Sequence, residues 1–363
     1  MAHINLDVNE EEKALNGNSL PPEMNPDFLV IRIVGRIVLS VIKQCWALSG
    51  AMFISICVFY WIFGGISAFI LLWFSAAGIV YHAGDKMLYY PEVPANSRLF
   101  VPAPNMFGLP FESVYLKSLD STKLHAYFIL QPQPHQCKTI LFFHGNAGNI
   151  GHRLPNAKGL YKHLHANILL VEYRGYGLSE GVPSESGLYK DAQAALNYLL
   201  GRQDIDPRQI IVFGRSLGGA VAVDLTVSKS NQGKIACLIV ENSFTSIPEM
   251  AKQIIPWKGL RYIPLWFHKN KFENKKKAGA IQCPVVFVSG LADQLVPPCM
   301  MLDLYTQCGS ERKILLQIPN GDHNGTWTKP TYYSQLARSV EDACSDRILM
   351  QEHHLQHVSV HTV

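Results

Sequence analysis

The sequence predicts an α/β fold in which helices and a short cap flank a mostly parallel central sheet, with an N-terminal transmembrane anchor before it. Three observations predict this architecture. Strand-like and helix-like segments alternate along residues 111–346, one pentapeptide has the form Gly-x-Ser-x-Gly, and a long uncharged run lies near the N-terminus. Together they indicate one globular α/β domain held at a membrane.

The alternating region consists of short apolar runs separated by amphipathic stretches. Because helices cover both faces of a parallel sheet, its strands appear as nearly continuous apolar runs. We expect an opening hairpin at 111–117 and 124–131 and then buried strands at 139–144, 168–173, 210–213, 235–240, 285–288 and 314–318. Helices are expected at 185–200 and 300–307.

The uncharged run covers residues 44–81, which contain no Asp, Glu, Lys, Arg or His. A spanning helix needs about 20 residues, so this run is too long for one span and barely enough for two. We expect one span with its core at Phe59–Val80, preceded by an interfacial stretch that carries Trp46 and Gly50. A second pass is left open. Polar residues before the run and the lack of a compact cleavage site after it favour a signal anchor.

The basic residues on either side of the run predict its orientation. Arg32, Arg36 and Lys43 precede it, whereas Lys86 and Arg98 follow it. Cytoplasmic flanks carry the excess of Lys and Arg, so we expect a single-pass type II protein with a cytoplasmic N-terminus and a lumenal or extracellular domain.

The remaining organisation follows from composition. We expect a disordered acidic tail at 1–29, a membrane anchor segment at 30–85, a linker at 86–110, the α/β domain at 111–346 with a cap at about 244–282, and a C-terminal tail at 347–363.

Composition and motifs exclude several functions. The net charge is only +4 and no aromatic-interleaved basic stripe is present, so no nucleic acid partner is expected. The eight cysteines contain no C-x-x-C pair. The glycines of Gly175–Gly181 miss the dinucleotide spacing by one residue and indicate a turn. We therefore expect neither a cofactor nor a metal.

The pentapeptide Gly214-Arg215-Ser216-Leu217-Gly218 lies between an apolar run and a helical run. A serine lifted onto a sharp strand-to-helix turn needs an unusual backbone angle, and flanking glycines have no Cβ to collide with neighbouring chain. The first N–H groups of the following helix favour an anion. The pattern predicts Ser216 as a nucleophile and the Leu217 N–H as one oxyanion donor.

A serine hydroxyl needs a histidine to take its proton and a carboxylate to orient that histidine. Where a serine occupies such a turn, the acid and then the histidine follow it in the chain. Asp293 and His323 each come directly after a predicted strand, so the predicted triad is Ser216, Asp293 and His323. Asp322 is a rival acid, but as the neighbour of His323 it could hardly orient the same ring. Asp303 lies within a predicted helix.

The second oxyanion donor is expected in the loop after an earlier strand. Residues 144–149 have this place, and their glycines allow a close approach of the backbone, so the Asn146 N–H is the candidate. The alternative is a simple glycine turn. His144 is expected to brace the loop, because His323 already fills the acid–base role.

Six stretches carry a resemblance: FFHGNAGNIGHRLPNA, VEYRGYGLSEG, FGRSLGGAVA, VENSFTSIP, SGLADQLVPP and NGDHNGTW. The chain resembles the membrane-anchored ABHD-type α/β-hydrolases from the anchor to about Ala343. The resemblance implies the α/β-hydrolase fold, the triad Ser216, Asp293 and His323, and a single-pass anchor with a cytoplasmic N-terminus. It also implies acyl-protein thioesterase activity. It implies nothing about the two tails.

The expected cap combines aromatic residues with a basic segment. Between Lys252 and Lys277, eight basic residues accompany only one acidic residue, Glu273. We expect an apolar slot for an acyl chain with a basic rim that meets anionic lipid or protein. A helical cap core with a solvated basic face is equally compatible. A sequon at Asn324-Gly325-Thr326 lies beside His323, where a glycan could obstruct the site.

The expected function is therefore cleavage of a palmitoyl-protein thioester at the lipid bilayer, with an acylated protein or lipid as substrate. Lysophospholipid or monoacylglycerol hydrolysis is the alternative within the same chemistry. A catalytically idle binding or scaffold protein is the alternative from another class.

Overall fold

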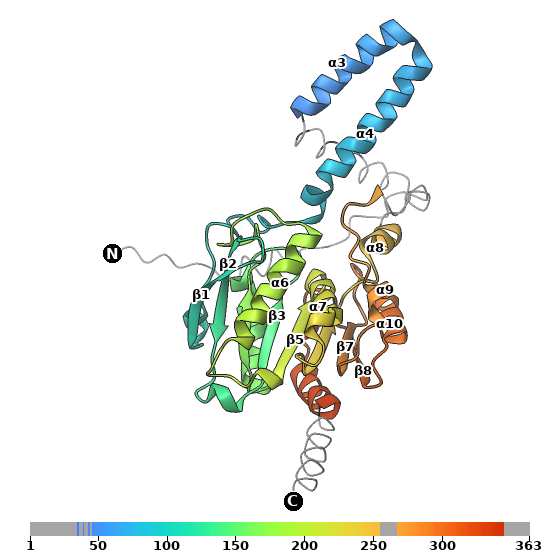
Figure 1. The fold of residues 1–363 in the computed structure, drawn as a ribbon. Coiled ribbons are helices and arrows are strands. Elements are labelled where there is room, and N and C mark those ends of the chain that lie inside the picture. The colour runs from blue at the N-terminus through green and yellow to red at the C-terminus, as the bar shows by residue number, and fades with distance from the viewer. Residues whose placement is uncertain (1–34, 36–38, 40–42, 44–45, 255–266, 345–363) are drawn as a thin grey trace, which may run out of the picture. The chain divides into compact units, whose positions relative to one another are not determined.

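The computed structural model describes residues 46–254 and 267–344, together with Gly35, Leu39 and Lys43 (Figure 1). The predicted tails at 1–29 and 347–363 lie outside the described residues, as do residues 255–266 of the expected cap and the flanking Arg32 and Arg36. The chain divides into two compact units, with the boundary in the N-terminal region between Ile79 and Val80.

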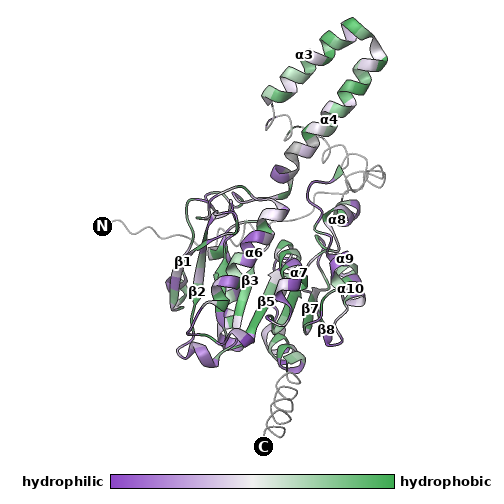
Figure 2. Ribbon diagram, in the orientation of Figure 1, coloured by the Kyte–Doolittle hydropathy of each residue, from purple (hydrophilic) through white to green (hydrophobic). Residues whose placement is uncertain are grey.

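The N-terminal unit contains helix α3 (Trp46–Phe63) and the first part of helix α4 (Gly65–Leu88). Both are apolar along this part of the chain (Figure 2). Large side chains such as Trp61 and Ile66 are almost fully exposed, at 89% and 82%. Within the described ranges, one helix, α3, is long and apolar enough to cross a membrane, whereas the apolar part of α4, Gly65–Ile79, is shorter.

The expected continuous helix at Phe59–Val80 is interrupted at Gly64. Gly64 has φ +83°, a left-handed conformation that glycine adopts without the penalty a Cβ imposes. The helix therefore ends at Phe63 and a new one begins at Gly65. The span with sufficient length is displaced toward the N-terminus and includes Trp46 and Gly50, which we had placed in an interfacial stretch.

The second unit is built on an eight-stranded sheet with the order β1-β2-β4-β3-β5-β6-β7-β8. The strands are β1 (Phe111–Lys117), β2 (Lys123–Ile129), β3 (Thr139–Phe143), β4 (Asn167–Val171), β5 (Ile210–Arg215), β6 (Cys237–Glu241), β7 (Val285–Gly290) and β8 (Lys313–Ile318). β1 and β2 form an antiparallel hairpin, β2 pairs antiparallel with β4, and all the remaining pairs are parallel. The predicted α/β fold with a mostly parallel sheet is confirmed.

Helices cover both faces of this sheet (Figure 1). The described α-helices of the unit are the end of α4 from Val80, α5 (Leu154–His163), α6 (Glu185–Leu200), α7 (Leu217–Val227), α8 (Ile247–Ile254), α9 (Asn274–Ala278), α10 (Pro298–Gln307) and a C-terminal helix at residues 332–344. Adjacent strand residues divide between two apolar cores: Phe143 belongs to the core that includes residues of α6, α7 and α10, whereas Phe142 belongs to the core that includes residues of α5 and the C-terminal helix. Burial on both faces explains the continuous apolar runs.

The parallel strands bring several loops to one edge of the sheet. The carboxyl ends of parallel strands meet at the same edge, and ligands of open α/β sheets bind there. The loops after β3, β5, β7 and β8 all begin at this edge. They carry the residues that the sequence predicted for the site.

Candidate active site

Ser216 occupies a strained turn between β5 and α7. Its backbone has φ 54° and ψ −117°, which is rare for a residue with a side chain. Two glycines make the turn possible. A Cβ on Gly218 would lie 2.1 Å from the Phe143 carbonyl oxygen of β3, and one on Gly214 would lie 2.2 Å from the Gly218 oxygen. The chain packs too closely here for any side chain.

Neighbouring strands and loops fix this turn by hydrogen bonds. The Ser216 N–H donates to the Glu241 oxygen at the end of β6 at 2.9 Å. The Ser243 hydroxyl donates to the Ser216 carbonyl at 2.8 Å. Leu217 is the first residue of α7, so its N–H belongs to the helix-start group that has no intrahelical acceptor. This N–H is therefore available to an oxyanion, and its role as a donor stays a prediction.

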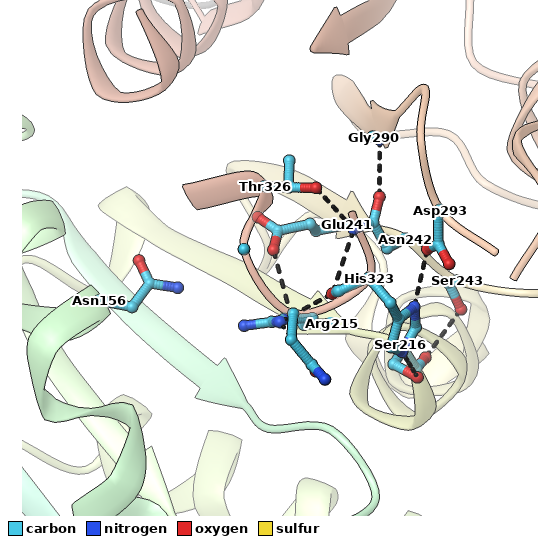
Figure 3. A network of polar contacts seen from close by, with 12 residues as sticks. Asn156, Arg215, Ser216, Glu241, Asn242, Ser243, Gly290, Asp293, His323 and Thr326 are labelled. Atoms are coloured by element: carbon cyan, nitrogen blue, oxygen red, sulfur yellow. Dashed lines mark hydrogen bonds and ion pairs between the residues drawn. The ribbon is translucent and has the colours of Figure 1, made fainter. Parts of the chain in front are cut away.

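The structure brings Ser216, His323 and Asp293 into one hydrogen-bonded row (Figure 3). His323 Nε2 lies 3.0 Å from Ser216 Oγ, and His323 Nδ1 lies 2.7 Å from Asp293 Oδ2. The Asp293 side chain is 1% exposed, and its other oxygen accepts the N–H groups of Leu295 and Val296 at 2.9 and 2.8 Å. These bonds fix the carboxylate that orients the imidazole.

The rival acids have other partners. Asp322 Oδ1 accepts the backbone N–H groups of Asn324 and Gly325 and so closes the turn that carries His323. Asp303 lies on α10 and pairs with Lys275 at 2.9 Å. Neither carboxylate reaches the His323 ring in this arrangement, whereas Asp293 does.

The loop after β3 approaches Ser216 from the other side. A Cβ on Gly145 would lie 3.6 Å from Ser216 Cβ, so the Gly145-Asn146 backbone passes directly beside the nucleophile. The loop therefore lies near enough to Ser216 to carry the second oxyanion donor, and the role of the Asn146 N–H stays a prediction. The Asn146 side chain has other partners: its Nδ2 donates to the Leu88 carbonyl and its Oδ1 accepts from the Tyr176 hydroxyl.

His144 and Glu172 form a fully buried pair beneath this loop. His144 Nε2 lies 3.1 Å from Glu172 Oε1, and both side chains have 0% exposure. The other ring nitrogen lies 2.7 Å from the Gly145 carbonyl, and Glu172 Oε2 accepts the Ile150 N–H at 3.0 Å. His144 therefore holds the start of the loop, and Glu172 holds its end.

A buried ion pair, Arg215 with Glu241, lies beside the Ser216–His323–Asp293 row (Figure 3). Arg215 Nε lies 3.4 Å from Glu241 Oε1, and Tyr332 donates its hydroxyl to the other carboxylate oxygen. Burial raises the pKa of Glu241, while Arg215 and Tyr332 act in the opposite direction. Arg215 Nη2 also donates to the His323 carbonyl at 2.8 Å. The residue that precedes Ser216 thus holds the loop that carries His323.

Asn242 ties the same loop to two strands (Figure 3). It has φ 44°, a conformation that Asn tolerates better than most residues. Its Nδ2 donates to the Thr326 hydroxyl at 3.0 Å, and its Oδ1 accepts the Gly290 N–H at 2.8 Å. The turn after β6 thereby connects the end of β7 to the loop after β8.

The described part of the chain contains no cluster of three His, Cys, Asp or Glu side chains arranged to hold a metal ion. The chemistry open to this arrangement is proton transfer between Ser216 and His323, with Asp293 fixing the ring.

Known proteins are similar to this chain in sequence and in fold. Residues 138–267 match the model of the alpha/beta hydrolase fold. An alpha/beta hydrolase domain-containing protein of Arabidopsis thaliana, WAV2, is 41% identical over 254 residues, which cover 67% of this chain and 82% of that protein. The chain belongs to the α/β-hydrolase family.

One further relative of this α/β-hydrolase and one solved structure extend the comparison. An uncharacterized membrane protein of Saccharomyces cerevisiae is 33% identical over 70% of this chain and 87% of its own length. The structure of an esterase of Pyrococcus furiosus superposes with a TM-score of 0.55 at 19% identity, covering 68% of this chain and 98% of that one. The esterase shares the fold. The description of the yeast relative as a membrane protein is consistent with the apolar helix α3 near the N-terminus of this chain.

Sequence reasoning missed the buried acids that support the α/β-hydrolase site. Glu172 follows β4 and Glu241 ends β6, and both are carboxylates next to long apolar runs. A carboxylate buried beside an apolar strand has to be paired or neutralised, so the sequence could have predicted that each of these acids has a buried partner. Their partners, His144 and Arg215, lie in other segments, and only the fold brings them together.

We expect Gly218→Ala to destabilise the α/β-hydrolase domain by about 2–3 kcal/mol, because the added Cβ would overlap the β3 backbone. Gly201→Ala is a matched control, since Gly201 ends α6 with φ −86° and its nearest neighbours lie 3.6 Å from the added carbon. It should be neutral or slightly stabilising. Thermal unfolding in detergent measures both variants, and equal losses would contradict the packing argument.

We expect Arg215→Met to lower the free energy of unfolding by about 3 kcal/mol, because it leaves the Glu241 carboxylate buried without its cation. The folded-state pKa of Glu241 is above its usual value of 4.5, so the protein takes up this proton as pH falls toward 4.5. Without Arg215 the pKa of Glu241 rises further, so the deficit should be full above the variant's pKa and shrink as pH falls toward the wild-type pKa, which itself lies above 4.5.

Unfolding curves of the wild type and Arg215→Met across this pH range measure the effect. The double variant Arg215→Met/Glu241→Gln should recover most of the loss, since it removes both charges. A deficit that is independent of pH, or that persists unchanged in the double variant, would refute the charge-pair explanation.

Proposed function

We propose that this α/β-hydrolase is a membrane-anchored serine hydrolase that cleaves acyl thioesters or esters through an acyl-enzyme on Ser216. One observation carries the proposal: the hydrogen-bonded row from Ser216 Oγ to His323 to Asp293, with distances of 3.0 and 2.7 Å. Its order and spacing fit a serine nucleophile, its general base and the carboxylate that orients that base.

In the proposed first step, Ser216 Oγ attacks the acyl carbon while His323 Nε2 takes the hydroxyl proton. Asp293 accepts the Nδ1–H and stabilises the imidazolium that forms. The carbonyl oxygen becomes an oxyanion between the N–H groups of Leu217 and Asn146. Collapse of this intermediate expels the thiolate or alkoxide, which receives the proton from His323, and leaves the acyl group on Ser216.

Hydrolysis of the acyl-enzyme repeats the sequence with water. His323 removes a proton from the water as its oxygen attacks the acyl carbon, and the same two N–H groups hold the second oxyanion. When this intermediate collapses, His323 returns the proton to Ser216 Oγ. The products are the free carboxylic acid and the resting serine.

A long acyl chain on a protein cysteine is the substrate that we favour. Leu291 and Leu295 lie two residues to either side of Asp293 and are 45% and 48% exposed, which gives the site an apolar border for an alkyl chain. Attachment to a bilayer raises the local concentration of lipid-modified substrates. These features support palmitoyl-protein hydrolysis at a membrane.

For the anchor we propose a single pass in the type II orientation. With α3 as the span, Arg32, Arg36 and Lys43 lie within about 15 residues of its start, and the chain carries no Lys or Arg between Phe63 and Lys86. The charge difference across α3 therefore favours a cytoplasmic N-terminus and a lumenal or extracellular hydrolase domain.

A fluorophosphonate probe tests the chemistry. We expect the membrane-bound wild type to be labelled and Ser216→Ala to be unlabelled, because the probe reacts with an activated serine. Turnover of a palmitoyl thioester, a lysophospholipid, a monoacylglycerol and a short-chain ester then identifies the substrate class. A wild type that resists labelling, or Ser216→Ala that is labelled equally, would favour a catalytically idle binding or scaffold protein.

Protease protection tests the orientation. In sealed microsomal vesicles we expect added protease to leave the hydrolase domain intact until detergent opens the membrane. A reporter protein from the vesicle lumen serves as the control for sealing. Digestion of the domain in sealed vesicles would place it on the cytoplasmic side, as two passes by α3 and α4 would also do.

A further inference from the structure

The side chain of Asn146 links the loop beside Ser216 to the chain that follows the apolar helices. Its Nδ2 donates to the carbonyl of Leu88, the last residue of α4, while its Oδ1 accepts the Tyr176 hydroxyl at 2.9 Å. The next residue, Ala147, forms a parallel bridge with Tyr90. Two consecutive loop residues are thus attached to residues 88–90.

Residues 85–90 are in turn fixed to the rest of the domain. Asp85 accepts from Lys269 and from the Asn270 amide, the latter at 2.7 Å. The Tyr89 hydroxyl donates to Asn270 Oδ1 at 2.9 Å, and the Glu185 N–H donates to the same oxygen at 3.1 Å. Tyr89 is 3% exposed, and its burial raises the pKa of the phenol, which stays a donor. The segment is therefore held at the start of α6.

Helix α4 is continuous from Gly65 to Leu88. Its first fifteen residues, Gly65–Ile79, are apolar, and its last residue supplies the carbonyl that Asn146 binds.

We propose that residues 85–90 are a structural part of the oxyanion hole, and that Asn146 positions the loop through its side chain while its own N–H serves the oxyanion. This inference rests on the proposed function. An oxyanion donor must lie within hydrogen-bond reach of the place where charge develops, and loss of one donor costs about 10²–10³ in rate. Loosening the loop should cost part of that factor and leave substrate binding nearly unchanged.

Asn146→Ala in the full-length, membrane-bound protein tests the tether, because it keeps the backbone N–H and removes the bonds to Leu88 and Tyr176. We expect kcat and the rate of fluorophosphonate labelling to fall about tenfold or more, with KM within about twofold of the wild type. Asn167→Ala is the control. Like Asn146, Asn167 is hydrogen-bonded through its side chain, and it is fully buried, but it lies at the start of β4, at the opposite end of the strands from the site. This variant should lose stability without losing labelling rate.

Asp85→Ala is the second test variant. It removes the bonds of Asp85 to Lys269 and Asn270 and so loosens residues 85–90 without changing the loop at Asn146. We expect a smaller reduction of kcat in the same direction. If Asn146→Ala fails to fold, the Asp85→Ala result decides. Wild-type labelling rates in the folded variants, or an equal reduction in Asn167→Ala, would overturn the inference. A wild type that resists the probe would instead overturn the proposed function, so the two failures are distinguishable.

Discussion

The close contact between the Ser216 turn and the end of β3 is the constraint on which the site depends. A serine backbone at φ 54° costs about 1–3 kcal/mol, and it persists only where the surrounding structure fixes it. Here the Glu241 carbonyl accepts its N–H, and Gly218 lies against the Phe143 carbonyl with no room for a side chain. The packing that strains the turn also brings Gly145 beside the serine. Ser216 and the loop proposed to hold the oxyanion are therefore placed by one contact.

Two buried acids, Glu172 and Glu241, support the loops on either side of this contact. Glu172 holds the loop after β3 through His144 and the Ile150 N–H, while Glu241 pairs with Arg215, which holds the carbonyl of His323. Buried polar pairs of this kind contribute little net stability, because the cost of desolvation offsets the attraction between the partners. Their effect is geometric: each loop has one favoured position relative to Ser216.

The sequence predicted the elements that depend on local pattern. The hairpin and the parallel strands were recognisable because buried strands are apolar runs, and helix α6 lies where its periodicity placed it. The residues of the Ser216–His323–Asp293 row could be selected because each follows a strand at the same edge of the sheet. Their catalytic role stays a prediction.

What the sequence could not provide depends on contacts between distant segments or on a single backbone angle. The break at Gly64 is one such case, since glycine inside an apolar run is also compatible with a continuous helix. The pairing of Arg215 with Glu241 is another, because no local pattern relates the two positions. The expected linker at 86–110 contains the buried Tyr89 and Leu109, which belong to the same compact unit as the sheet.

The attachment of Leu88 and Tyr90 to the loop at Asn146 and Ala147 also bears on proteolytic release from the membrane. A cut ahead of Asp85 would free the domain with this attachment complete. A cut between Tyr90 and Phe111 would free the sheet and the Ser216 row but leave residues 85–90 behind with the anchor. Two shed forms that differ by a few residues at their N-termini would thus share a fold and differ in how firmly the loop beside the serine is held.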